Sequence, residues 1–220
     1  MVFLISADDL PTPNPALNDS DFAHLIGDLG KKKHTIVNVN RNEATCREFI
    51  SSFMNAAVAH VKAEDERLQL KIEEWLDGPR GYGPLDYSVD VDGAVVLVHE
   101  AKKEDFEKGA AQNIVQMHSA VETLRTKRKL LPEDDNDSTV PVLVYGVVTN
   151  ALQWIFLRWG GSSDKPTIEV SPLYYCGLDQ DIGDGRQVQQ IIGYLITILQ
   201  SQVRGLKEPE KRVHIKRRRS

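Results

Sequence analysis

The stretch GPLDYSVDVDGAVVLVHEAKK, residues 83–103, decides the fold of this chain. Apolar and polar residues alternate over residues 85–91, as in a strand with one buried face. The dipeptide Asp92-Gly93 follows and is typical of a tight hairpin turn. A strongly apolar run then covers residues 94–101. The stretch therefore predicts an antiparallel β-hairpin that ends in acidic and basic side chains.

The register of this hairpin decides which side chains meet. Glu100 and Lys102 share one face because side chains alternate along a strand. A strict two-residue turn places Asp86 opposite His99, on the wrong face from Glu100. A three-residue loop or a β-bulge, with Gly93 at positive φ, instead places Asp86 opposite Glu100. We expect one of these two irregularities.

The flanking sequence predicts helices on both sides of the hairpin. Apolar residues recur at helical spacing over 42–62, with Asn42 as the N-cap, and again over 104–129. A continuous Val-rich run at 140–149 is typical of a central strand buried on both faces. The other predicted elements are strands at 68–75, 152–159 and 167–175 and a helix at 187–203.

This order predicts an α/β (α+β) domain with a mixed central sheet flanked by helices. We place the domain at residues 41–204, after an N-terminal extension at 1–40 and before a basic tail at 205–220. Within the extension, a short helix from Ser20 to Ile26, ended by Gly27 or Gly30, precedes an extended segment at 34–39.

Composition narrows the functional classes. The 220 residues are 41% hydrophobic and 27% charged, which is typical of a globular domain. No apolar run is long enough to cross a membrane, and no secretory signal is evident. The net charge is −5, although residues 207–220 contain seven lysines and arginines and only two glutamates. Cys46 and Cys176 lie far apart, so we expect two buried free thiols in an intracellular, reducing compartment.

The order of helix, hairpin with Asp and Glu-x-Lys, then helix with Gln resembles the core of the PD-(D/E)xK phosphodiesterases. The likeness covers roughly residues 42–160. The segments NEATCREFI, GPLDY, HEAKKEDFEKGAAQNIVQ and GVVTNALQWIFL are also similar to the nuclease-like carboxy-terminal domains of Crinkler-type proteins of fungi and oomycetes. The resemblance implies a restriction-endonuclease-like αβββαβ core.

The same resemblance implies a Mg²⁺-dependent endonuclease with Mn²⁺ as a substitute metal. Its substrate is DNA or RNA, and DNA is the more expected of the two. The resemblance assigns the metal to Asp86, Glu100 and Glu43, and the positioning of water or phosphate to Lys102. Carboxylates hold a hard cation that lowers the pKa of bound water and offsets phosphate charge. Two glutamines on the following helix match a glutamine of the family: Gln112 and Gln116. The motif proline is displaced, since Pro84 precedes Asp86 by two residues.

Several cations are candidates for contacts with nucleic acid: Lys103, Arg125, Lys127, Arg128, Lys129, Lys216, Arg217, Arg218 and Arg219. Those in the tail also suit a nuclear-import signal, or simply a solubilising end. The main alternative to a nuclease is a catalytically silent nuclease-fold module that binds nucleic acid or a protein. A further alternative is an acidic interaction protein. A homodimer is compatible with the sequence.

Other residues have alternative explanations that involve no site. Glu43 also suits the first turn of a helix, where a carboxylate favours the macrodipole, and Glu48 is a weaker site candidate. Gln112 and Gln116 equally suit a solvated face. His99 is expected to pack on the opposite face of the sheet from Glu100. The larger aromatic residues are expected in the core: Tyr145, Trp154, Phe156 and Trp159.

Overall fold

The computed structural model describes residues 2–4, 17–39, 41–78, 81–101, 106–130, 143–161, 166–180 and 185–206. They form a mixed α+β structure in which four helices flank one mixed sheet. The elements are β1 (Val2–Leu4), α1 (Asp19–Thr35), α2 (Glu43–Lys62), β2 (Leu68–Gly78), β3 (Gly81–Val91), β4 (Ala94–Ala101), α3 (Phe106–Leu130), β5 (Val144–Thr149), β6 (Gln153–Gly161), β7 (Pro166–Val170), β8 (Tyr174–Tyr175) and α4 (Arg186–Gly205).

The sheet has the strand order β1-β7-β6-β5-β4-β3-β2, with β8 pairing to β6. Strands β2, β3 and β4 form an antiparallel meander, and α3 then crosses over so that β5 runs parallel to β4. A parallel pair needs such a crossover, which explains the long helix between two apolar strands. The predicted central strand, β5, is buried at every position.

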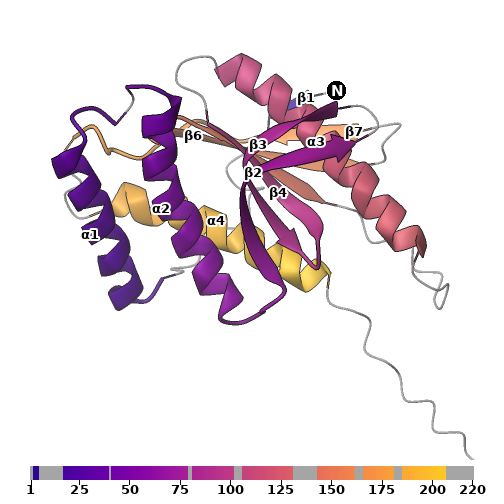
Figure 1. Ribbon diagram of the computed structural model, residues 1–220, viewed down its shortest axis with the longest axis horizontal. Helices are drawn as coiled ribbons and strands as arrows, with labels where there is room; N and C mark the ends of the chain where they lie inside the picture. The colour runs from indigo at the N-terminus through magenta and orange to yellow at the C-terminus, as the bar shows by residue number, and fades with distance from the viewer. Residues whose placement is uncertain are drawn as a thin grey trace, which may run out of the picture.

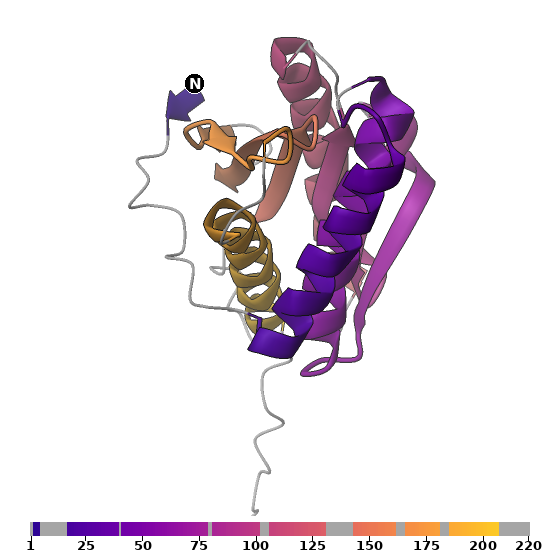
Figure 2. The same cartoon turned by 90° about the vertical axis from the view of Figure 1, so that its left-hand side faces the viewer.

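Two hydrophobic cores lie on opposite faces of the sheet. One face packs against α2, α4 and the inner side of α1, and the other packs against α3. Figure 1 shows α3 apart from the other three helices, and Figure 2 shows α1 as the outermost of these three. In both views the end of β4, the start of α2 and the start of α3 lie at the same edge of the molecule.

The β3–β4 hairpin contains both a two-residue turn and a bulge. Asp92 and Gly93 have φ values of 52° and 70°, as a tight type I′ turn requires. The pairing passes from Asp90↔Val95 to Val89↔Leu97, so Val96 is an extra residue on β4. The pair Tyr87↔His99 therefore follows the bulged register, and it is the last pair between the two strands. The same register continued by one residue would set Asp86 opposite Glu100. This confirms the irregularity that the sequence requires.

The N-terminal region packs into the core as a longer helix than expected. The expectation of a short helix ended by glycine was wrong, because α1 continues through Gly27 and Gly30 to Thr35. A Cβ added at either glycine would meet nothing within 4 Å, whereas Leu25 and Leu29 are buried in the core. Tertiary packing of the leucines therefore overrides the low helix propensity of glycine. The extended segment expected at 34–39 does not pair as a strand, and α1 takes up its first two residues.

Several other predictions can be compared directly. Asn42 caps α2, since its side chain accepts a hydrogen bond from the Thr45 amide at 2.8 Å. Cys46 and Cys176 are buried free thiols, as expected. The strand predicted at 167–175 is interrupted, because β7 ends before Pro172 and only β8 resumes pairing. The four core aromatics are all buried, as predicted: Tyr145, Trp154, Phe156 and Trp159. Among the helices described, none is both long and apolar enough to span a membrane.

Candidate active site

Asp86 lies just beyond the paired part of β3 and β4, at a one-residue gap in the pairing of β3 with β2. The β2–β3 pairing passes from Ile72↔Tyr87 to Glu74↔Leu85 and omits Asp86 in the described strands. The Asp86 carboxylate takes over one backbone interaction, because its Oδ2 accepts a hydrogen bond from the Ala101 amide at 2.7 Å. The side chain is therefore fixed against the end of β4, next to Glu100, and 20% of it stays exposed.

Glu100 is a buried carboxylate that faces α3. It is 4% exposed, and its Oε2 accepts a hydrogen bond from the Gln116 side-chain amide at 2.9 Å. Burial of an ionised carboxylate is unfavourable unless hydrogen bonds replace its water. Gln116 supplies one such bond without adding a charge, so it orients Glu100 and does not neutralise it.

The side-chain oxygen of Gln116 is a second buried polar atom beside Glu100. Gln116 Oε1 is buried and has no hydrogen-bond partner among the described residues. A buried acceptor of this kind loses free energy unless a donor reaches it. A donor such as a metal-bound water or a lysine ammonium would satisfy it. The sequence left open a solvated face for this glutamine, and the structure buries it against the sheet.

Arg47 of α2 reaches the same carboxylate from the other side of the sheet. Its Nη1 lies 3.3 Å from Asp86 Oδ1 and 2.6 Å from Glu73 Oε1. Glu73 sits on β2 where the pairing omits Asp86, with a positive φ of 52° that is strained for a residue other than glycine. The Tyr87 hydroxyl donates to the Arg47 carbonyl at 2.8 Å and so fixes the backbone of α2 here.

The other predicted carboxylate, Glu43, is exposed in the first turn of α2. It precedes Arg47 by one helical turn, so both residues lie on the same side of the helix. Among the described residues there is no group of three His, Cys, Asp or Glu side chains arranged to hold a metal. The structure therefore brings Asp86 and Glu100 together, but it does not complete a three-carboxylate cluster with Glu43.

The remaining predicted residues are only partly described. Gln112 is half-buried on α3, one turn before Gln116, and Arg125 is half-buried nearer the end of that helix. Lys102 and Lys103 lie outside the described residues, as does the basic tail with Lys216, Arg217, Arg218 and Arg219. The side chains at the end of α3 are also outside the description: Lys127, Arg128 and Lys129.

The donor set fits a hard divalent cation. Two carboxylates from adjacent strands offer the oxygen ligands that Mg²⁺ prefers, and Mg²⁺ commonly keeps several waters beside one or two carboxylates. The unsatisfied Gln116 oxygen is placed to accept a hydrogen bond from such a water. Asp86 and Glu100 are therefore the described residues that would hold the ion.

Sequence reasoning missed Arg47 and Glu73. The signal that could have indicated Glu73 lies in β2, where the alternation of apolar and polar residues fails between Ile72 and Trp75. The positive φ of Glu73 lies at this break. Arg47 gave no signal, because its position beside Asp86 follows only once helix and hairpin are packed together.

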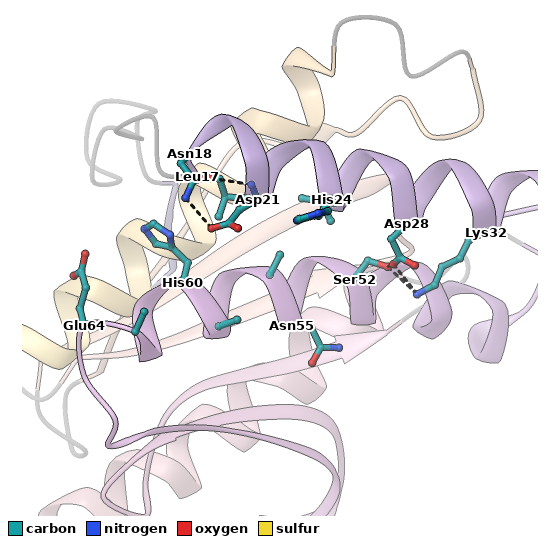
Figure 3. Close-up of a pocket in the computed structure, with 14 residues that line it drawn as sticks. Leu17, Asn18, Asp21, His24, Asp28, Lys32, Ser52, Asn55, His60 and Glu64 are labelled. Atoms are coloured by element: carbon teal, nitrogen blue, oxygen red, sulfur yellow. Dashed lines mark hydrogen bonds and ion pairs between the residues drawn. The ribbon is translucent and has the colours of Figure 1, made fainter.

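A separate groove runs between α1 and α2 (Figure 3). Lys32 spans it, with its ammonium 3.3 Å from Asp28 Oδ2 and hydrogen-bonded to the Ser52 hydroxyl at 2.8 Å. Ser52 in turn donates to Asp28 at 2.5 Å. These contacts tie the two helices together, and the groove holds none of the predicted site residues. Its polar groups therefore have a structural explanation.

Comparison with known proteins finds a distant relative. The chain is 26% identical over 180 residues to Crinkler effector protein 1 of Rhizophagus irregularis. The match covers 80% of this chain but only 35% of that protein, so the chain spans about a third of the relative's length. No family model matches the chain. The comparison supports the Crinkler-like resemblance of the sequence.

Proposed function

We propose that this chain is a Mg²⁺-dependent nuclease domain of the PD-(D/E)xK type that hydrolyses phosphodiester bonds in DNA or RNA. The observation that carries this proposal is the bulged hairpin, which brings the Asp86 carboxylate beside Glu100. The strand-helix order around it, α2-β2-β3-β4-α3-β5, agrees with the αβββαβ core that the sequence resemblance implies.

Each residue has a distinct chemical role in this proposal. Asp86 and Glu100 bind the cation, and Gln116 holds Glu100 in position through its amide. Mg²⁺, when bound, lowers the pKa of a coordinated water and offsets the charge on the phosphate. Lys102 follows Glu100 by two residues in the sequence, and in this proposal it orients the attacking water or the scissile phosphate. Glu43, exposed in the first turn of α2, is not needed for this pair of ligands.

Cleavage assays with paired variants test the proposal. Purified chain is incubated with plasmid, single-stranded DNA and RNA in Mg²⁺ or Mn²⁺, with chelator as the blank. Asp86→Asn is expected to lower the cleavage rate by about 10² or more, since it removes a metal ligand. Asp92→Asn, at the opposite end of the same hairpin, should leave the rate unchanged.

Lys102→Ala gives a second, independent pair. It is expected to abolish cleavage while the chain keeps its melting temperature, and Lys108→Ala on the exposed start of α3 serves as its control. Absence of cleavage by the wild-type chain on all three substrates in both metals would refute the nuclease proposal.

One observation favours the catalytically silent alternative. The described residues contain no three-ligand metal cluster, and Arg47 already lies against Asp86. The relative found by comparison is named an effector, and an effector domain of this kind would use the fold to bind nucleic acid or a protein. In that case nucleic acid would bind without metal, and Asp86→Asn would leave binding intact.

A further inference from the structure

We infer that Arg47 is an internal counter-ion of Asp86, which a divalent cation displaces and which then binds the phosphate of the substrate. This inference rests on the proposed nuclease function and names a residue of the same site. Its basis is the shared Nη1 contact, 3.3 Å to Asp86 Oδ1 and 2.6 Å to Glu73 Oε1.

Arg47 and a divalent cation are both positively charged, so we expect them to compete for the Asp86 carboxylate. A guanidinium and a doubly charged ion bound to the same carboxylate repel each other strongly at a few ångströms in a partly buried site. The same guanidinium also neutralises Asp86 when no metal is bound, which lowers the cost of burying acidic groups at this edge. Metal binding therefore requires Arg47 to withdraw.

Glu73 provides the place to which Arg47 withdraws. The Arg47–Glu73 contact is the shorter of the two, and Glu73 is held on β2 in its strained conformation beside Asp86. The Arg47 side chain is 31% exposed, so its guanidinium has room to move toward solvent. An arginine anchored at one nitrogen keeps its other N–H donors for an anion.

The withdrawn guanidinium suits a phosphate. Arginine presents planar, paired donors that match phosphate oxygens, and its positive charge persists at any working pH. The start of α2 and the end of β4 lie at the same edge of the molecule (Figure 1). A phosphodiester held at Asp86 and Glu100 would therefore pass beside Arg47.

The test measures metal and nucleic acid separately. Mn²⁺ affinity is measured by the loss of the free-ion paramagnetic signal, with no substrate present. Binding of a short DNA duplex is measured in Ca²⁺ as a non-cleaving metal. Arg47→Gln is expected to bind Mn²⁺ about tenfold more tightly than wild type, because a competing cation is gone. It should bind the duplex several-fold more weakly, with a salt dependence reduced by about one phosphate contact.

Matched variants exclude a merely structural role. Arg158→Gln removes an arginine paired with Glu169 across β6 and β7, away from the site, and should change neither affinity. Glu73→Gln loosens the anchor of Arg47 and should weaken Mn²⁺ binding, opposite in sign to Arg47→Gln. This effect should shrink in the double variant, because the two residues act through one contact. Melting temperatures identify any variant that is misfolded.

The outcomes separate this inference from the proposed function. Equal Mn²⁺ affinity of wild type and Arg47→Gln, or parallel weakening of metal and duplex binding, overturns the role of Arg47 and leaves the nuclease proposal standing. If no chain binds Mn²⁺, including Arg47→Gln, both proposals fail.

Discussion

Two neighbouring residues of β4, His99 and Glu100, lie on opposite faces of the sheet and have different surroundings. His99 points into the core beneath α2 and α4, and Glu100 points toward α3. Both side chains are buried, but neither ring nitrogen of His99 has a hydrogen-bond partner among the described residues, whereas Glu100 accepts one from Gln116. His99 instead packs edge-on against Tyr87, with ring centroids 5.3 Å apart.

The difference shows that burial of an ionisable group does not by itself make a site. On the α2/α4 face the surroundings keep the His99 ring neutral. Its neighbours there are the aromatic rings of Tyr87 and Trp154, which pack against it. On the α3 face polar side chains project toward the sheet, including Gln116 and Asn113, whose amide donates to the Val98 carbonyl at 3.3 Å. Of these two buried groups, the one with a side-chain hydrogen bond, Glu100, belongs to the candidate site.

The largest expected effect is an acid-induced loss of stability through His99. Complete burial lowers its pKa to about 3 from 6.5, so the unfolded chain binds a proton more readily than the folded one. This contribution to stability is intact above about pH 6.5 and is lost as the pH falls toward 3. It amounts to about 4 kcal/mol over that window.

Denaturant titrations of wild type and His99→Leu between pH 7 and pH 4 measure this effect. The difference in unfolding free energy between the two should change in favour of the variant as the pH falls. A difference that stays constant would show that the His99 ring binds a proton as readily in the folded chain as in the unfolded chain, and the contrast between the faces would be lost.

A second prediction concerns the tight contact between α3 and β5. A Cβ added at Gly146 would lie 1.8 Å from Asn113 Oδ1 and 2.7 Å from Met117 Sδ. Gly146→Ala should therefore destabilise the chain by about 1–3 kcal/mol, since α3 or its side chains must shift. Gly30→Ala is the control, because its added methyl meets nothing within 4 Å, and it should stabilise α1 slightly. Chemical unfolding measures both.

A third prediction removes the donor to Glu100. Gln116→Leu leaves a buried carboxylate oxygen without this amide and should cost about 1–3 kcal/mol of stability. On the proposed function it should also lower the cleavage rate. Gln112→Leu, one turn earlier and half-buried, should change stability by no more than about 0.5 kcal/mol. Equal effects of the two substitutions would contradict the placement of Gln116 at the site.

The smallest effect is one of reactivity. Burial on the α2/α4 face raises the pKa of the Cys176 thiol to about 12. The reactive thiolate is therefore scarce, and alkylation near pH 8 should be slow in the folded chain and fast in denaturant. Mass spectrometry after a timed exposure to iodoacetamide tests this. Rapid labelling of Cys176 under native conditions would show that this core opens readily.

The sequence predicted the hairpin, its turn at Asp92-Gly93 and the need for either a three-residue loop or a bulge, because each follows from local chemistry and from strand alternation. It did not predict that the bulge falls at Val96, since both Val96 and Leu97 are apolar and only packing against α2 and α4 buries them together. It also missed the full length of α1, where contacts with α2 outweigh the two glycines.

The residues of the candidate site also fall into those that the sequence predicted and those that it missed. Asp86 and Glu100 were expected together from the register of the hairpin, and Gln116 was assigned from the family resemblance. In the structure Asp86 accepts a hydrogen bond from the amide that follows Glu100, and Gln116 donates one to Glu100. Arg47 and Glu73 were missed because they meet only through contacts between α2 and β2. Glu43 was assigned from a resemblance, which does not fix how far the start of a helix lies from a strand.

Because of the extra residue in β4, the faces on which the two acids lie depend on whether the number of residues between them is odd or even. A deletion or insertion of one residue between the two acids, far from either, would exchange the acid and the imidazole between the two sides of the molecule unless a compensating change occurred nearby. Relatives of this chain should therefore fall into two groups, according to whether their hairpin has an odd or an even number of residues. One group keeps both acids on one side of the sheet, and the other does not, even where every acidic residue is retained.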